Sequence, residues 1–219
     1  AWEIALQGQG GHVAPINYWL MHAWASVTPF QWGMQVVATA ALWIVADVAV
    51  VLAFRALWGW GWPTAAAYAC YAVSTFTLPS FLWASQVWLG SMAVLSLALL
   101  VLGTARALRA PSAARTLTAV GLLVLALLLS ERAAFEAVLV GLLGIVAYAD
   151  RAGGLRAFAR RAWPLYAASA AVLALYAGYY LAVTRAAIDD PLLTVRPGTD
   201  GLVVNVLEGL GQSVVPGIL

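Results

Sequence analysis

The stretch TLTAVGLLVLALLL (116–129), SER (130–132) and AAFEAVLVGLLGIVAYA (133–149) decides the fold of this chain. It holds two apolar segments that are separated by three polar residues. One uninterrupted helix over this range would be about 50 Å long, whereas the hydrocarbon core of a bilayer is about 30 Å thick. We therefore expect a membrane hairpin that turns at Ser130-Glu131-Arg132.

Arginines flank both open ends of the predicted hairpin, and the chain contains no lysine. Loops rich in Lys and Arg face the cytoplasm in most membrane proteins, so we expect the Ser130 turn to lie on the outer face. The predicted inner loops hold most of the arginines: Arg55, Arg106, Arg109, Arg115, Arg151, Arg156, Arg160 and Arg161.

The composition independently indicates a membrane protein, with 64% hydrophobic residues, 9% charged residues and a mean hydropathy of +0.90. These values exclude an ordinary soluble domain. Several apolar runs approach the roughly 20 residues of a spanning helix, which favours a helical bundle over a barrel. The net charge of +2 is spread over many loops, so nucleic acid is not expected as a partner. Cys70, the single cysteine, is expected to be a small core residue.

We expect one all-α, polytopic transmembrane domain over residues 1–219, located in the plasma membrane with both ends outside. Residues 1–32 are expected to form an external loop and an interfacial amphipathic helix, with Pro15 at its start and Pro29 at its end. Residues 185–219 are expected to form an external loop and an interfacial segment. Because the chain begins with Ala1 and ends in an apolar run, we expect it to be part of a longer protein. About six spans are predicted within 33–184, at 33–54, 63–78, 86–105, 116–129, 133–149 and from Trp163-Pro164 to Thr184.

Glu3 and His12 lie in a polar, glycine-rich segment ahead of the predicted interfacial helix. A carboxylate beside an imidazole is suited to general acid–base chemistry, so both residues are candidate catalytic groups. The alternative is a solvated Glu3, with His12 packed against the helix that follows.

A second group of candidates lies at the predicted hairpin turn, where Glu131, Arg132 and Glu136 follow one another closely. The guanidinium could hold a lipid phosphate while a carboxylate binds a sugar hydroxyl or a metal ion. Alternatively, Glu131 stabilises a helix start and Arg132 pairs with Glu136 four residues later.

Two further acidic positions are candidates. Asp189, next to Asp190, is a candidate substrate ligand and a weak indication of a divalent metal ion, although solvent exposure would also explain it. Asp47 lies within the first predicted span, where a carboxylate costs about 2.5–3.5 kcal/mol on insertion scales. We expect Asp47 to act in a proton relay, to be protonated, or to hydrogen-bond to a Ser, Thr or Trp of a neighbouring helix.

Four short motifs carry a family resemblance: GGHVAP (10–15), LPSFLW (78–83), SERA (130–133) and PGIL (216–219). In this order, the chain resembles a group of actinobacterial multi-pass membrane proteins that are themselves similar to the GT-C superfamily of glycosyltransferases. An acidic residue is expected immediately before Gly-His in this pattern. This chain has Gly10 there, so Glu3 is the carboxylate of that loop.

The resemblance implies an enzyme that moves a sugar from a polyprenyl-phosphate donor to a cell-envelope acceptor on the outer membrane face. An acid in the first external loop would take the proton of the acceptor hydroxyl, while cationic groups or a metal ion hold the lipid phosphate. Two alternatives stay open: a transporter or lipid flippase that uses Asp47, and a noncatalytic subunit of an envelope assembly.

Overall fold

The computed structural model describes residues 14–27, 31–73 and 84–188, and these ranges contain helices and turns but no strand. This confirms the prediction of an all-α membrane protein. The α-helices are α2 (Pro15–Val27), α3 (Trp32–Trp58), α4 (Trp62–Ala72), α6 (Ala84–Arg109), α7 (Ala113–Leu129), α8 (Ala133–Tyr148) and α9 (Leu155–Ile188), and a 3₁₀ turn, η1 (Asp150–Ala152), joins α8 to α9.

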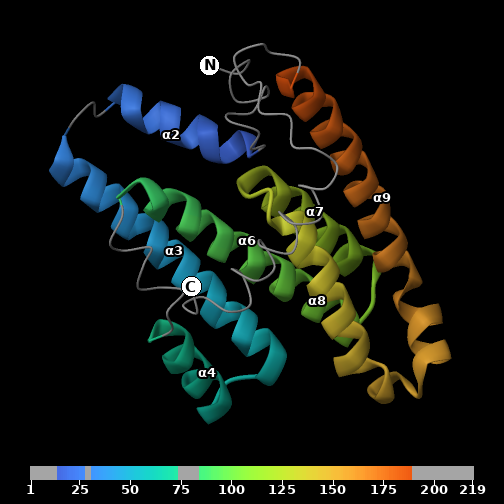
Figure 1. Cartoon of the computed structure of the whole chain (residues 1–219). Coiled ribbons are helices and arrows are strands. Elements are labelled where there is room, and N and C mark those ends of the chain that lie inside the picture. The colour runs from blue at the N-terminus through green and yellow to red at the C-terminus, as the bar shows by residue number, and fades with distance from the viewer. Residues whose placement is uncertain (1–13, 28–30, 74–83, 189–219) are drawn as a thin grey trace, which may run out of the picture.

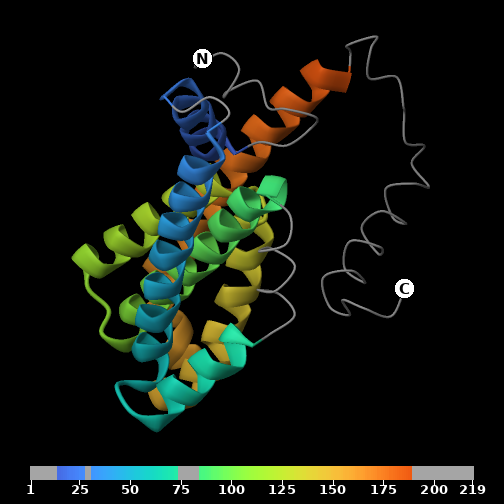
Figure 2. The same cartoon turned by 90° about the vertical axis from the view of Figure 1, so that its left-hand side faces the viewer.

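Helix α6 is the centre of the bundle, because it packs against α3, α7, α8 and α2. Figure 1 shows α3, α6, α7, α8 and α9 running along the bundle, with α2 placed across one end. The view from the side shows α4 folding back along α3 (Figure 2). The site described below lies where α2 meets α6 and α7.

The predicted hairpin is formed by α7 and α8. The Ser130 amide donates to the Ala126 carbonyl at the end of α7, and the Ala133 amide donates to the Ser130 carbonyl as α8 begins. Helix α8 continues when the Glu136 amide donates to the Arg132 carbonyl. The predicted turn at Ser130–Arg132 is therefore confirmed, and we call this end of the bundle, with α2 above it, the hairpin end.

Small side chains allow α3 to approach α6 closely. Ala46, Ala49, Ala53 and Ala56 recur every three or four residues on one face of α3, and all four are buried. The last three pack in one cluster with residues of α6 that include Ala98 and Ala105. Stripes of small residues are typical of membrane helix contacts, where association depends on close packing.

The outward faces of the bundle are apolar. Ile44 on α3, Val146 on α8 and Leu175 on α9 are 63%, 77% and 76% exposed, respectively. Three helical segments are long and apolar enough to cross a membrane: Val36–Trp58, Gly90–Arg109 and Leu155–Ala182. Helices α7 and α8 are shorter apolar helices of 17 and 16 residues. Lipid contact accounts for this exposed apolar surface, since water would not favour it.

The arginines of the predicted inner loops gather at the end of the bundle opposite the hairpin turn, which we call the arginine end. They lie where α3 and α6 end and where α7 and α9 begin. The Trp58–Trp62 segment also lies there, with Trp62 82% exposed and the Arg55 guanidinium 4.6 Å from the Trp60 ring.

Two local predictions were wrong. Helix α9 begins at Leu155, not at Trp163-Pro164, and Pro164 lies inside it. The reason is that Gly153 and Gly154, with φ of 87° and 105°, end the preceding turn in a conformation that favours glycine. Cys70 is exposed on α4 instead of buried. Helix α4 ends at Ala72, so the rest of the predicted span to Leu78 lies outside the described residues.

The α6–α7 contact provides a test of the packing. A Cβ at Gly103 would lie 3.1 Å from the Ala119 Cα, whereas a Cβ at Gly121 would have no atom within 4 Å. We expect Gly103→Leu to lower the free energy of unfolding by about 1–3 kcal/mol, because overpacking forces the two helices apart.

Thermal unfolding in detergent measures this effect, and Gly121→Leu on α7 is the matched control. The control should change stability by no more than about 0.5 kcal/mol. Equal losses in both variants would contradict the close α6–α7 contact.

Candidate functional site at the hairpin end

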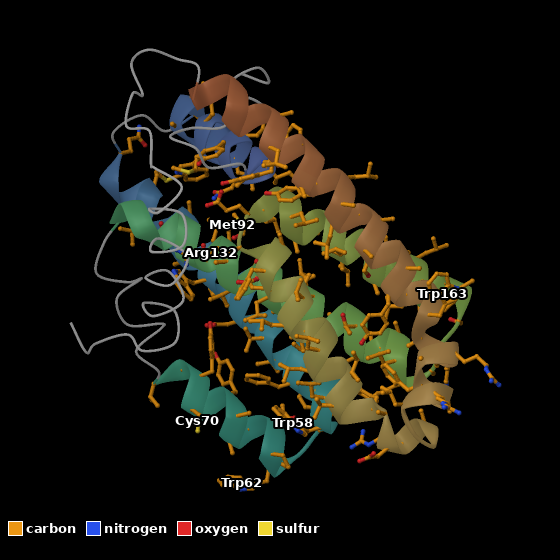
Figure 3. The ribbon with its side chains drawn as sticks, turned by 45° about the vertical axis from the view of Figure 1, so that its right-hand side comes forward. Trp58, Trp62, Cys70, Met92, Arg132 and Trp163 are labelled. Atoms are coloured by element: carbon orange, nitrogen blue, oxygen red, sulfur yellow. The ribbon has the colours of Figure 1, made fainter. Side chains whose placement is uncertain are left out.

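The hairpin end brings together three of the predicted site residues. Glu131 and Arg132 occupy the α7–α8 turn, and Glu136 lies in the first turn of α8. Figure 3 places Arg132 near Met92 of α6, at the end of the bundle covered by α2. Arg132 is exposed, while Glu131 and Glu136 are half-buried. Glu3, His12 and Asp189 lie outside the described residues.

Glu136 is held by α6. One of its carboxyl oxygens lies 3.2 Å from the hydroxyl oxygen of Ser96, and this hydroxyl oxygen lies 2.8 Å from the Ala93 carbonyl oxygen. Ser96 is fully buried, so the contact is shielded from solvent. A serine hydroxyl has a single proton and cannot donate fully to both oxygens at once. The Glu136 side chain is therefore positioned by a short hydrogen-bonded chain that crosses from α8 to α6.

Arg132 adds a positive charge to this arrangement. Its charge acts on Glu136, as expected for residues four positions apart at the start of a helix. The exposed guanidinium can therefore meet an incoming anion while Ser96 holds Glu136 in place. The pairing predicted between Arg132 and Glu136 is compatible with ligand binding by Arg132.

Helix α2 packs against α6 and α7 at the hairpin end. Its buried side chains include Asn17, which is 1% exposed, whereas Trp19 is 39% exposed. Two other polar side chains of this helix, His22 and Ser26, are exposed. The buried Asn17 and the exposed Trp19 fit a membrane setting, where a polar side chain gains by facing protein and an aromatic side chain by facing lipid.

Asn17 presents an unusual buried group. Its Oδ1 atom has no hydrogen-bond partner among the described residues. Helix α2, which carries Asn17, contacts both α6 and α7. A buried amide oxygen without a donor is costly and is a position at which a ligand hydroxyl could bind.

The negative charge of Glu131 acts on three tyrosines. Burial and then the negative charge of Glu131 raise the pKa of Tyr18 above its ordinary value of 10.0. The Glu131 charge also acts on Tyr176 and Tyr180 of α9. Phenol groups near a carboxylate provide donors and ring faces that suit a sugar. Sequence reasoning missed these tyrosines, although their spacing of four residues on α9 places Tyr176 and Tyr180 on one face.

Asp47 has a different environment, at the contact of α3 with α4. The Tyr71 hydroxyl donates to its carboxylate over 3.2 Å, and the Tyr68 hydroxyl interacts with it as well. A hydrogen bond from a neighbouring helix was expected, but its donor is a tyrosine, not a Ser, Thr or Trp. Asp47 therefore has a structural partner within the bundle.

The possible divalent metal ion is not supported by a ligand set in the part of the chain that the structure describes. Within residues 14–27, 31–73 and 84–188, no three His, Cys, Asp or Glu side chains come together to hold a metal. The described site can bind through carboxylates, a guanidinium, an amide and tyrosine hydroxyls.

The chain matches no protein-family model, no curated protein and no solved structure. Functional inference therefore depends on the geometry of the chain and on its sequence motifs.

The Asp47 contact yields a measurable prediction. We expect Tyr71→Phe to lower the free energy of unfolding by about 1–2 kcal/mol, because the hydrogen bond to the carboxylate is lost. The same substitution in an Asp47→Ala background should cost much less, since its partner is already absent. Thermal unfolding of the four proteins gives the interaction free energy. Identical costs in both backgrounds would show that Tyr71 stabilises the fold by packing alone.

Proposed function

We propose that this protein is a membrane glycosyltransferase similar to the GT-C superfamily, which moves a sugar from a polyprenyl-phosphate donor to a cell-envelope acceptor. One observation carries the proposal: Glu131, Arg132 and Glu136 gather at the hairpin end, beneath α2 and beside the tyrosines of α9. Carboxylates and a guanidinium at the edge of a membrane bundle match the two parts of a lipid-linked sugar.

The proposed topology has six spanning helices in the plasma membrane, with the hairpin end on the outer face and the arginine end in the cytoplasm. Helices α7 and α8 would cross as a hairpin, since helices of 17 and 16 residues are near the lower limit for spanning. The charge asymmetry between the two ends supports this orientation.

The proposed reaction is displacement at the anomeric carbon of the donor sugar. An acceptor hydroxyl oxygen bonds to this carbon as the bond from the carbon to the phosphate oxygen breaks, and polyprenyl phosphate leaves. A general base takes the hydroxyl proton, and we assign this role to Glu3 with His12 beside it, both outside the described residues.

The described residues bind the donor in this scheme. Arg132 stabilises the negative charge that develops on the leaving phosphate. Glu131 accepts hydrogen bonds from sugar hydroxyls. Glu136, which Ser96 positions, limits how far the sugar enters the site. Asp189 is assigned to acceptor binding. The buried Asn17 amide of α2 would bind a further hydroxyl.

Two rival proposals exist: a transporter or lipid flippase, and a noncatalytic subunit of an envelope assembly. Transport through this chain would use Asp47, but Tyr71 and Tyr68 already engage that carboxylate at the α3–α4 contact. This arrangement favours a structural role for Asp47, so we favour sugar transfer at the hairpin end.

The activity is tested with the full protein in lipid vesicles and a radiolabelled polyprenyl-phosphate sugar. We expect Arg132→Gln to reduce turnover roughly 100-fold, as typical for the loss of a group that stabilises transition-state charge. Arg156→Gln is the control, because Arg156 is an equally exposed arginine at the other end. The proposal fails if the unmodified protein neither transfers nor hydrolyses any such donor while a known enzyme does so in parallel.

The orientation is tested separately with single cysteines in a Cys70→Ala background. Cysteines at Arg132 and Ala157 occupy exposed positions at opposite ends of the bundle. We expect an impermeant maleimide to label the first from outside intact cells and the second only after permeabilisation. Labelling of both from the same side would overturn the topology.

A further inference from the structure

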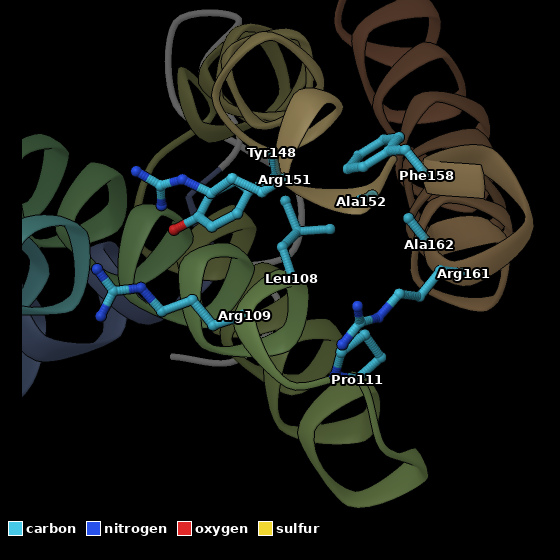
Figure 4. Close-up of a pocket in the computed structure, with 9 residues that line it drawn as sticks. All are labelled: Leu108, Arg109, Pro111, Tyr148, Arg151, Ala152, Phe158, Arg161 and Ala162. Carbon is cyan, nitrogen blue, oxygen red and sulfur yellow. The ribbon is translucent and has the colours of Figure 1, made fainter. Parts of the chain in front are cut away.

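The arginine end contains a cavity of about 150 Å³ between α6, α8, η1 and α9. Its lining includes Arg109, Arg151 and Arg161, together with the aromatic side chains of Tyr148 and Phe158. Figure 4 shows Arg109 and Arg151 extending to one side of the cavity and Arg161 extending toward Pro111 on the other. No acidic residue lines this cavity among the described residues.

Two of the three guanidinium groups are held in place by groups other than carboxylates. Arg109 donates to the Leu57 carbonyl at the end of α3. The Arg151 guanidinium lies 5.4 Å from the centre of the Tyr148 ring. Carbonyl and ring contacts orient a guanidinium but do not neutralise its charge. The cavity therefore combines positive charge with fixed donors.

The positive surface continues beyond Arg109. A neighbouring cavity of about 240 Å³ is lined by Arg55, Arg106 and Arg109, so Arg109 is shared by the two cavities. Repulsion among these groups is relieved when an anion binds between them. Arginines whose only role is to orient a protein in the membrane would not need to line two cavities.

An apolar cavity of about 260 Å³ follows on the hydrocarbon side, along the seam between α8 and α9. Ile145, Leu165 and Thr104 line it, and each lies about one helical turn from a residue of the arginine cavity: Tyr148, Ala162 and Leu108, respectively. The half-exposed Val138 and Leu142 form part of its wall, so the seam opens toward lipid.

We propose that the arginine end binds an anionic phospholipid, with its phosphate in the cavity that Arg109, Arg151 and Arg161 line and one acyl chain along the α8–α9 seam. A guanidinium cluster provides several charge-assisted hydrogen bonds to phosphate oxygens. The adjoining apolar seam selects a phosphate that carries a hydrocarbon chain, which a free phosphate lacks. Basic pockets between membrane helices on the cytoplasmic side are suited to such headgroups.

The headgroup is tested by native mass spectrometry of the full protein with phosphatidylglycerol or phosphatidylcholine. We expect phosphatidylglycerol to stay bound and phosphatidylcholine to be lost. The double variant Arg151→Gln, Arg161→Gln should weaken phosphatidylglycerol binding about 25-fold, at roughly 5-fold for each arginine removed.

The matched control is Arg156→Gln, Arg160→Gln, which removes the same charge from exposed residues that line neither cavity. It should retain phosphatidylglycerol to within about 2-fold, since charge at a distance from a bound lipid is screened. Equal loss in the two double variants would overturn the site and leave only general surface charge. Circular dichroism and thermal unfolding establish that each variant is folded before binding is compared.

The acyl chain is tested with Ala170→Trp, which places a large ring in the seam, and with Leu175→Trp on the exposed face of the same helix. The first should reduce phosphatidylglycerol binding at least 5-fold and the second should not. Excess glycerol 3-phosphate should fail to displace the lipid. Full displacement, or equal effects of the two tryptophans, would overturn the lipid assignment in favour of a simple anion site.

Discussion

Close approach of helix backbones through small side chains is the constraint on which this structure depends. Lipid tails are as apolar as the helices, so burial of apolar surface gives membrane helices little reason to associate, and packing must supply the attraction. The alanine stripe of α3 and Gly103 of α6 allow this approach. A Cβ at Gly144 of α8 would lie only 2.8 Å from a Leu108 methyl group, so α8 is equally close to α6. With α6 fixed between these neighbours, the α7–α8 turn is brought beneath α2.

The hairpin could be predicted because its determinants are local in sequence. The lengths of the two apolar segments and the three polar residues between them define both helices and their turn. The arginines of the predicted inner loops fall at one end of the bundle because successive helices run in opposite directions. The contacts that hold Glu136 and Asp47 could not be predicted, because Ser96 and Tyr71 are far away in the chain and depend on helix rotation. The burial of Asn17 on α2 could not be predicted for a related reason. Its periodicity located one apolar face, but lipid and protein compete for such a face in a membrane.

Polar chemistry is divided between the two ends of the bundle. The hairpin end combines acids, an amide and tyrosines around one arginine, while the cavities of the arginine end have no acidic lining residue among those described. Between them, apart from the hydrogen bond from Tyr71 to Asp47, the contacts are made largely by alanine, leucine, glycine and buried serines. The bundle therefore keeps the mixed acidic and basic groups of the hairpin end apart from the basic groups of the arginine end.

The length of α9 sets a further condition on how the protein sits in a bilayer. From Trp163 to Thr184, just before Arg185, the helix is about 33 Å long, at about 1.5 Å per residue. To fit within a hydrocarbon core of about 30 Å, this segment would have to tilt by about 25°, close to the average of membrane helices. Only 6% of its most apolar window is buried against the rest of the protein, and the Gly153-Gly154 joint at its base has no side chains to restrain it. Hydrophobic mismatch therefore acts on α9 first, and a thinner or thicker bilayer would change the angle of this helix before it disturbed the packed centre.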